Sequence, residues 1–592
     1  MVSYKNFLSI SVIMIILLFM FQFLQVFVEH ENEYNINEQV EYSDVPENII
    51  LDGPTEREKI VYVGDKESAI AKVVSQWCTY TKREYISSVR IPEETELKKL
   101  TEKVPELFLL DAGHVDFEKE TSLIEDITLQ GIPVVFCNLP DISVIEKNEK
   151  LRELLGISEI ISENTAVEGL QVYSGFFLGG ELILKAEKEE DLEKQDLKLN
   201  MPWFSMDAGT KVYMVGMLDE EQVPREEFPA CLWRNHVENS FVFAVNGDYM
   251  STLTGIGILD AFVHELRDYT LYPVVNAESV IVTNYPSFAR ENEDRIFELY
   301  SRDTKSFERD IVWPGIVALA EKRNLKLTFM LTPQFDYLDE IEPDEADYVF
   351  YLQQMKEIDG EAGMSLANWK QVPITEKISR DKAFFDLIEN QYKYASCYME
   401  DASSEELEQV VGQNPALQGI RTIAYQQGTK YPLLAFYNAG VTLQGITGDA
   451  KQYTFSQELQ YRSLETALGY SNFMLDAERV LWPELKEDQW ENYSDEVFSN
   501  ISIYWKQNRK FDNTTLLESD KRLRSFLNLQ YSQIRDGNTI YMKLKNHGEQ
   551  SWFLLRTHGE SVVAVKGADY QMLEDDIYLL QIYSENVEIQ LE

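Results

Sequence analysis

Carboxylates near the ends of predicted strands are the side chains with which this chain could do chemistry. They lie between residues 276 and 515, and they are Asp336, Glu361, Glu400, Asp401 and Asp476. Two such groups, one as acid and one as base or nucleophile, are enough to hydrolyse a glycosidic bond. Carboxylates are abundant here, because the chain has 101 Asp and Glu residues, so most of them serve only the surface. A carboxylate-based glycosidase is therefore kept as an alternative.

The distribution of histidine limits the chemistry further. The chain holds six histidines, and none lies between His264 and His547. A Ser-His-Asp arrangement built within that interval is excluded, and so is a metal site that needs histidine there. The four cysteines are scattered without metal-binding spacing. Cys137 follows a predicted strand but lacks the flanking glycines of a nucleophile elbow. We expect no metal and no cofactor.

The charge of the chain restricts its partners. Against 54 Lys and Arg stand 101 Asp and Glu, which gives a formal net charge of −47 over 592 residues. Nucleic-acid binding is excluded as a function, because its affinity comes from basic residues that neutralise phosphates. A cationic partner, or none, fits better. Hydrophobic residues are 44% and aromatic residues 12%, a globular composition.

The N-terminal segment predicts a membrane anchor over residues 1–28. The stretch from Phe7 to Val28 has no charge and is long enough to span a hydrocarbon core of about 30 Å. Lys5 precedes it and carboxylates follow, so the positive-inside rule places the N-terminus in the cytoplasm. No small-residue cleavage site follows, which favours a retained signal anchor. We expect an acidic stalk over 29–54, a single-pass protein of the cell membrane and an extracellular bulk.

Three folded units are predicted after the stalk, in a chain of the α/β class. Over 55–275, buried strands alternate with helical stretches, which predicts a flavodoxin-like or amidotransferase-like α/β domain. Over 276–515, the same alternation predicts a (β/α) barrel, in which chemistry lies at the carboxyl ends of the strands. Over 520–592, short strands of period two separated by turns predict a small β-sandwich.

Three signals in the barrel occur in the order found in NodB-type polysaccharide deacetylases. They are 282–286 (VTNYP), 325–330 (LKLTFM) and 361–369 (EAGMSLANW). The barrel resembles that family, whose members bind a metal through one Asp and two His and use a second Asp as base. The resemblance aligns these carboxylates with Asn284 or Tyr285, and the histidines with Ser365 and Trp369. It therefore implies a degenerate, catalytically silent deacetylase-like barrel.

A more specific resemblance covers nearly the whole predicted exterior. It rests on 241–247, 255–257, 271–276, 300–302, 310–314 and 462–470. These segments resemble an uncharacterised bacterial family of membrane-anchored, deacetylase-like proteins, some of them encoded beside genes for Pel-type exopolysaccharide synthesis. The resemblance implies a non-catalytic role in exopolysaccharide biosynthesis, guidance or export, with a polysaccharide synthase complex as partner.

The charge suggests what such a protein would hold. A partly deacetylated aminosugar polymer is cationic, and an acidic groove suits it. Tyr285, Trp369 and Tyr398 are candidates for stacking on sugar rings, although packing explains each of them as well. Two alternatives stay open: a carboxylate-based glycoside hydrolase that acts on the polymer, and an envelope scaffold without glycan binding.

Overall fold

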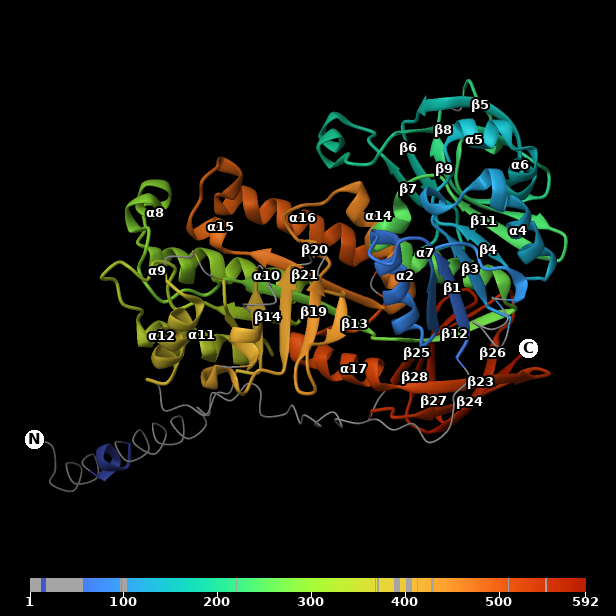
Figure 1. Cartoon of the computed structure of the whole chain (residues 1–592). Helices are drawn as coiled ribbons and strands as arrows, with labels where there is room; N and C mark the ends of the chain where they lie inside the picture. The colour runs from blue at the N-terminus through green and yellow to red at the C-terminus, as the bar shows by residue number, and fades with distance from the viewer. Residues whose placement is uncertain are drawn as a thin grey trace, which may run out of the picture.

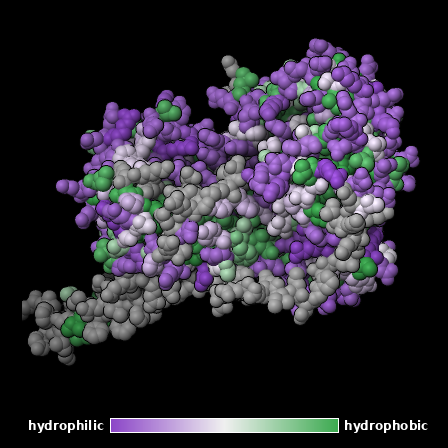
Figure 2. All heavy atoms as spheres, in the orientation of Figure 1, coloured by the Kyte–Doolittle hydropathy of each residue, from purple (hydrophilic) through white to green (hydrophobic). Residues whose placement is uncertain are grey.

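The computed structural model describes residues 12–17 and 57–592, except 96, 98–103, 220, 368, 370–371, 388–393, 401–406, 413, 427–430, 509 and 549–550. Figure 1 shows an N-terminal α/β unit, a barrel unit and a pair of C-terminal sheets packed side by side. On the face drawn in Figure 2, hydrophilic residues dominate and hydrophobic ones are scattered in small groups.

The structure corrects the predicted membrane anchor. Among the described residues, no helix is long and apolar enough to cross a membrane. Of the predicted span, the structure describes only residues 12–17, which are helical. The rest of that span and the predicted stalk over 29–54 lie outside the described residues. This finding overturns the transmembrane helix of the predicted fold class and the predicted single-pass membrane localisation, whereas the described chain is a mixed α/β protein with sheets and a half-barrel.

The N-terminal unit is built on one mixed sheet. Its strand order in the described chain is β2-β1-β3-β4-β11-β10-β9-β6-β7. The parallel part consists of β2 (Glu84–Ser88), β1 (Lys59–Val63), β3 (Leu107–Leu110), β4 (Val134–Phe136) and β11 (Ser240–Val245). The antiparallel part consists of β10 (Ala230–Val237), β9 (Thr210–Met217), β6 (Gly169–Val172) and β7 (Leu182–Lys185). β1, β3 and β4 are apolar along nearly their whole length because both of their faces are buried.

Helices cover both faces of this sheet. α2 (Ala69–Tyr80) and α7 (Thr254–Leu266) pack on one face, and α4 (Phe117–Leu129) and α6 (Glu149–Leu155) pack on the other. α7 also packs against α14 (Phe455–Leu468) of the barrel unit. A Cβ at Gly257 of α7 would lie 2.3 Å from the carbonyl oxygen of Ser463, so this close approach requires glycine.

The barrel unit is a strongly curved sheet whose main strands are parallel. They are β13 (Ala277–Thr283), β14 (Leu327–Leu331), β15 (Glu361–Ser365), β16 (Ser396–Met399), β17 (Thr422–Gln426), β19 (Thr442–Ile446) and β21 (Tyr470–Asp476). β20 (Gly448–Asp449) closely follows β19 and pairs with β21, which brings the two ends of the half-barrel together. Its outer helices include α10 (Trp313–Arg323), α11 (Glu345–Glu357), α12 (Ile374–Phe385) and α16 (Trp490–Asn508). Because the strands are parallel, their carboxyl ends share one edge, which we call the barrel mouth.

The opposite end of the barrel, the barrel floor, is covered by α17 (Leu516–Asn528). The backbone N–H of Leu516 donates to Oγ1 of Thr328, and that of Leu517 donates to Oε2 of Glu361. α17 leads directly into the C-terminal strands, so it joins the floor to the sheets beyond it.

In the described chain, the C-terminal sheets combine seven C-terminal strands with one strand from the middle of the chain. One has the order β23-β24-β29-β26 and the other β12-β25-β28-β27. The strands are β23 (Gln530–Asp536), β24 (Thr539–Lys545), β25 (Ser551–Thr557), β26 (Val562–Lys566), β27 (Ala568–Glu574), β28 (Ile577–Ile582) and β29 (Asn586–Leu591). β12 (Tyr269–Val274) precedes the barrel in the sequence, yet it pairs with β25. β12 lies on the N-terminal side of the predicted boundary at residue 275, yet it belongs to a C-terminal sheet.

Candidate functional site: the barrel mouth

A cavity of about 800 Å³ opens at the barrel mouth. It is lined by the carboxylates Glu400, Asp476, Glu478, Glu484 and Asp488. The cationic side chains around it are Arg295, Lys451 and Arg479. Carboxylates thus outnumber cations in the lining, and the cavity favours a neutral or cationic occupant.

A chain of hydrogen bonds joins three strand ends at the centre of the mouth. Ser365, the last residue of β15, donates through Oγ to Oδ1 of Asn284 at 2.5 Å. Nδ2 of Asn284 donates to Oε2 of Glu478 at 2.9 Å. The indole Nε1 of Trp369 donates to Oε1 of the same carboxylate at 2.7 Å. Asn284 directly follows β13 with φ +58°, a left-handed conformation that asparagine tolerates better than most residues.

Glu478 is therefore held from two sides by neutral donors. It begins the short helix α15 (Glu478–Leu481), two residues after the end of β21. Burial raises the pKa of Glu478 to about 7, the nearby carboxylates Asp476 and Glu400 raise it as well, and the bond from Trp369 opposes the rise. A carboxyl group with this pKa carries a proton for part of the time at neutral pH.

The neighbouring acid, Asp476, is paired instead with a cation. Its Oδ2 lies 3.4 Å from Nε of Arg479, and Nη2 of Arg479 lies 3.2 Å from Oδ2 of Asp449. Burial raises the pKa of Asp476 to about 6, against the lowering effect of Arg479. Asp476 and Glu478 thus stand next to each other with different partners, one ionic and one neutral.

The aromatic side chains at the mouth differ in what they can offer a ligand. Trp369 is 37% exposed and stacks on Phe335 with ring centroids 5.5 Å apart. Its other neighbour is Trp482, which also lines the cavity, at 4.9 Å and nearly perpendicular. Tyr398 lines the cavity but is only 2% exposed, and its hydroxyl contacts Gln426 and Met474. The tryptophans are therefore the open aromatic surfaces of the mouth.

Tyr285, predicted as a stacking residue, has no exposed surface. It lies in the barrel core with Trp313 at 6.4 Å and Tyr351 at 5.9 Å between ring centroids. A side chain without accessible surface cannot stack on a sugar ring, so the prediction for Tyr285 is wrong.

The predicted carboxylates fall in different places. Glu400 and Asp476 line the mouth. Glu361 lies at the barrel floor, where its carboxylate accepts from Thr328, Ser396 and the backbone of Leu517. Asp336 lies in the loop after β14, where its Oδ1 accepts from the backbone of Leu338. Asp401 lies outside the described residues. Neither Glu361 nor Asp336 therefore lines the cavity at the mouth.

Glu478 is the functional candidate that the sequence did not suggest. Its only signal is its place two residues beyond Asp476, in the segment Asp476-Ala477-Glu478. A carboxylate in the first turn after a barrel strand faces the mouth as readily as one at the strand end.

The positions aligned with the deacetylase metal site do not fit a metal ion. Asn284 and Ser365 bond to each other, and Trp369 supplies a donor where a ligand would have to accept. In the described part of the chain, no group of three or more His, Cys, Asp or Glu side chains is placed to hold a metal. We therefore derive no metal-dependent step at this mouth.

Comparison with known proteins gives weak likenesses. No curated protein matches the chain. A family model described as an uncharacterised protein conserved in bacteria (DUF2194) matches residues 134–366, which run from β4 of the N-terminal unit to the end of β15 in the barrel. That family description carries no activity.

Solved structures resemble parts of the chain. The exo-beta-1,4-mannosidase Op5Man5 from Opitutaceae bacterium strain TAV5 is 12% identical with a TM-score of 0.22, over 36% of this chain and 33% of the mannosidase. The cytoplasmic protein STM1381 from Salmonella typhimurium LT2 is 10% identical with a TM-score of 0.24, over 35% of this chain and 99% of that one. A protein described as a polysaccharide deacetylase from Mycobacterium smegmatis is 11% identical with a TM-score of 0.21, over 40% of this chain and 94% of that one. The chain thus spans about a third of the mannosidase, and these likenesses are too weak to indicate an activity.

Proposed function

We propose that the barrel mouth binds a carbohydrate segment and neither deacetylates nor cleaves it. The observation that carries this proposal is the hydrogen-bond chain Ser365–Asn284–Glu478–Trp369. It uses the positions that resemble a metal site for contacts within the protein. It leaves beside them an acid-lined cavity of about 800 Å³ with open tryptophan surface.

The chemistry of the lining favours an aminosugar. Amine groups of a partly deacetylated polymer are cationic and would pair with Glu478, Asp476 and Glu400. The exposed part of Trp369 offers an apolar plane of the kind on which sugar rings pack. An uncharged sugar could pack on Trp369 but could not form ion pairs with the carboxylates.

The wider role in this proposal is exopolysaccharide biosynthesis, guidance or export of the Pel type, beside a polysaccharide synthase complex. It is supported only by the resemblance of the sequence and by the acidic mouth. A protein that guides a polymer needs a site that holds and releases it unchanged, and the catalytically unsuited centre of this mouth meets that need.

The test is binding of short glucosamine oligomers to the full chain, followed by calorimetry, with fully N-acetylated oligomers in parallel. We expect the cationic oligomers to bind at least tenfold more tightly than the acetylated ones, a difference of about 1.4 kcal/mol. Trp369→Ala should weaken binding at least tenfold. Trp203→Ala, a half-buried tryptophan of the N-terminal unit, is the matched control and should leave binding unchanged.

The same samples test the claim that no reaction occurs. Acetate release from the N-acetylated oligomers, with Zn²⁺ or Co²⁺ present, would contradict the proposal. Equal binding of both oligomers would refute the role of the carboxylates.

A glycoside hydrolase is the second candidate, favoured by one observation. Glu478 and Asp476 are adjacent carboxyl groups with pKa values of about 7 and about 6, and a raised pKa is what a general acid needs. This candidate predicts shorter oligomers as products and loss of cleavage in Glu478→Gln. If products keep their length while binding persists, the binding role stands and the hydrolase fails.

A further inference from the structure

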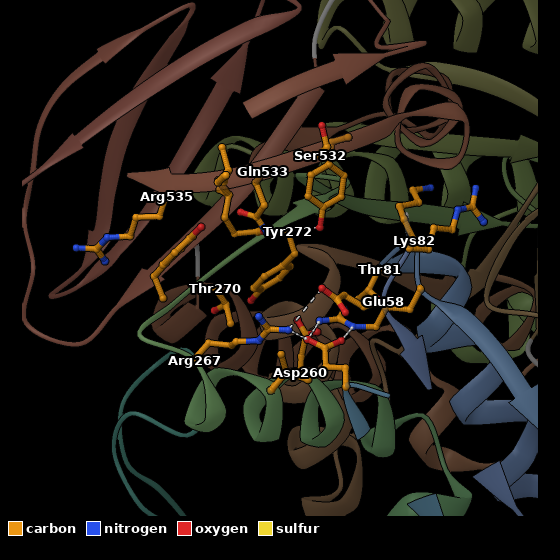
Figure 3. Close-up of a pocket in the computed structure, with 18 of the residues that line it drawn as sticks. Glu58, Thr81, Lys82, Asp260, Arg267, Thr270, Tyr272, Ser532, Gln533 and Arg535 are labelled. Carbon is orange, nitrogen blue, oxygen red and sulfur yellow. Dashed lines mark hydrogen bonds and ion pairs between the residues drawn. The ribbon is translucent and has the colours of Figure 1, made fainter. Parts of the chain in front are cut away.

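A second cavity lies where the N-terminal unit meets the C-terminal sheets, away from the barrel mouth (Figure 3). We call it the interdomain cleft, and its volume is about 400 Å³. Its walls are the start of β1, the loop 81–83 after α2, the end of α7, β12 and the strand β23. The cleft and the barrel mouth share no lining residue, so a ligand of the cleft is independent of the role proposed for the mouth.

The charge of the interdomain cleft is opposite to that of the chain. Five cationic side chains line it, namely Arg57, Lys82, Arg83, Arg267 and Arg535. Four carboxylates stand against them, namely Glu58, Glu106, Asp260 and Asp268. In a chain of net charge −47, a cleft whose cations outnumber its acids is a local reversal. Its own charges therefore favour an anion.

Most of these cations are already paired. Glu106 is shared by two arginines, with Nε of Arg83 at 2.6 Å and Nη2 of Arg267 at 2.8 Å. Arg535 forms a two-point ion pair with Glu560, which does not line the cleft. Nη2 of Arg267 also lies 3.9 Å from Oε1 of Glu58, so the arginines are balanced by carboxylates and leave little positive charge for a ligand.

Lys82 differs from the arginines. Its ammonium donates to the carbonyl oxygens of Phe526 and Leu527, at 2.7 and 3.0 Å, near the end of α17. In the described residues it makes no ion pair with a carboxylate, and it is half-buried. Burial lowers the pKa of Lys82 to about 7, with a smaller contribution from the nearby Arg57, whose side chain is exposed. An incoming anion would favour the charged form of Lys82 and balance that charge.

Asp260 supplies the second requirement on a ligand. Its Oδ1 accepts from the indole Nε1 of Trp77 at 3.0 Å. Its Oδ2 is buried and has no hydrogen-bond partner among the described residues, although the side chain lines the cleft and is only 4% exposed. A buried acceptor without a partner costs free energy that a donor from a ligand would recover. The ligand should therefore carry a hydroxyl or N–H group as well as its negative charge.

We propose that the interdomain cleft binds a small hydroxylated anion about the size of one sugar unit, a sugar acid or a sugar phosphate. Its anionic group pairs with Lys82 and Arg57, and one hydroxyl donates to Oδ2 of Asp260. The volume lies within the range of about 300–1,000 Å³ that is usual for small-molecule sites. Tyr269 and Tyr531 line the same cleft and give the apolar face of a sugar ring a surface to pack on.

The experiment is calorimetric titration of the full chain, at constant ionic strength and neutral pH, with four probes: glucuronate, glucose 6-phosphate, inorganic phosphate and glucose. We expect glucuronate or glucose 6-phosphate to bind at least tenfold more tightly than both glucose and inorganic phosphate. The stronger of the two identifies carboxylate or phosphate as the anionic group. If neither glucuronate nor glucose 6-phosphate binds more tightly than glucose, the proposal fails. If inorganic phosphate binds as tightly as the better of these two probes, the role of Asp260 is refuted.

Variants assign the binding to these side chains. Lys82→Gln should lower the affinity for the preferred probe at least tenfold, and Lys82→Arg should retain most of that affinity. Asp260→Asn keeps an acceptor for Trp77 and should reduce the affinity to that of inorganic phosphate. Lys566→Gln, an exposed lysine of β26 paired with Glu588, is the matched control and should bind like the wild type.

Arg57→Gln keeps the test decisive if a substitution at the half-buried Lys82 impairs folding. Because Arg57 is exposed, this variant should fold and should weaken binding at least threefold. Wild-type affinity in Arg57→Gln, or in a folded Lys82→Gln, would overturn the proposal.

Discussion

Replacing Glu478 by glutamine should stabilise the barrel unit at neutral pH. In the folded chain this carboxyl is largely buried, accepts from Asn284 and Trp369, and has its pKa raised from 4.5 to about 7. Glutamine is nearly isosteric with the protonated acid. Its Oε1 still accepts from Trp369, and a flipped Asn284 amide can accept from its NH₂ group. The variant therefore removes a charge that is costly to bury while keeping the contacts.

The size of the effect follows from linkage between protonation and folding. Below pH 4.5 the carboxyl is protonated in both states, so the variant and the wild type should be about equal in stability. Between pH 4.5 and about 7 the folded state binds more protons than the unfolded state, so the free energy of unfolding of the wild type falls as pH rises. At 1.36 kcal/mol for each pKa unit the ceiling is about 3 kcal/mol, and the part of Glu478 that contacts solvent reduces this to about 1–2 kcal/mol.

The assay is thermal unfolding of both proteins at pH 4.5 and pH 8, followed by calorimetry. A gain of about 1–2 kcal/mol corresponds to roughly 2–4 °C for each kcal/mol in a unit of this size. We expect the variant to melt higher at pH 8 and at the same temperature as the wild type at pH 4.5. Fluorescence of Trp369, isolated as the difference between wild type and Trp369→Phe, should titrate near pH 7 in the wild type and not in Glu478→Gln. Equal melting temperatures at both pH values, together with no titration, would refute the reasoning.

Substitutions at two further residues distinguish the barrel core and the barrel floor from the mouth. Tyr285→Ala should lower the free energy of unfolding by about 3–5 kcal/mol, because it leaves a cavity at an aromatic position of the barrel core. Tyr285→Phe loses only the hydrogen bond to the carbonyl of Glu308 and should lower the free energy of unfolding by about 0.5–1.5 kcal/mol. Similar melting temperatures for the two variants would contradict the placement of Tyr285 in the core. Glu361→Ala should destabilise the chain by more than about 1 kcal/mol in thermal unfolding, because it removes a buried acceptor of three donors. The affinity for glucosamine oligomers should not change in folded Glu361→Ala, and a loss of affinity at unchanged stability would argue against its place at the floor.

The strands of the barrel were predictable because their burial leaves a direct mark on the sequence. The runs SVIVT at 279–283 and LKLTFMLT at 325–332 are apolar on both faces, and the structure has β13 and β14 there. A parallel strand that is buried on both faces gives a nearly continuous apolar run in the sequence, whichever strands it pairs with. The helix α10 also carries a sequence signal, because it begins at Trp313 with proline in its first turn.

The site was harder to predict because strand direction decides which end of the barrel a residue faces. Glu361 and Ser365 belong to the same short strand, but Glu361 begins it and Ser365 ends it. Four steps at about 3.3 Å separate them by about 13 Å along the strand, which is the distance from floor towards mouth. The pattern of carboxylates near a strand therefore named Glu361, whereas the geometry selects Glu478, a residue in the helix that follows another strand.

The pairing of β12 with β25 could not be predicted from the local sequence pattern. β12 reads as one more strand of the N-terminal unit, and nothing in its own residues says that it pairs with β25, far along the chain. The interdomain cleft depends on that pairing, because β12 carries Tyr269 and α17 leads into β23. A site assembled from such segments has no linear motif.

The two cavities show why a net charge of −47 does not settle what the chain binds. At physiological salt the Debye length is about 8 Å, so an occupant senses mainly the charges that line its own cavity. At the mouth those charges are mostly carboxylates, two of them with raised pKa values, and a cationic group bound there would favour their ionised forms. In the cleft, Arg83 and Arg267 both form ion pairs with Glu106, and Lys82 has no carboxylate partner among the described residues. The global charge therefore governs long-range approach and solubility, while these local pairings are the basis for proposing a cationic occupant in one cavity and an anionic occupant in the other.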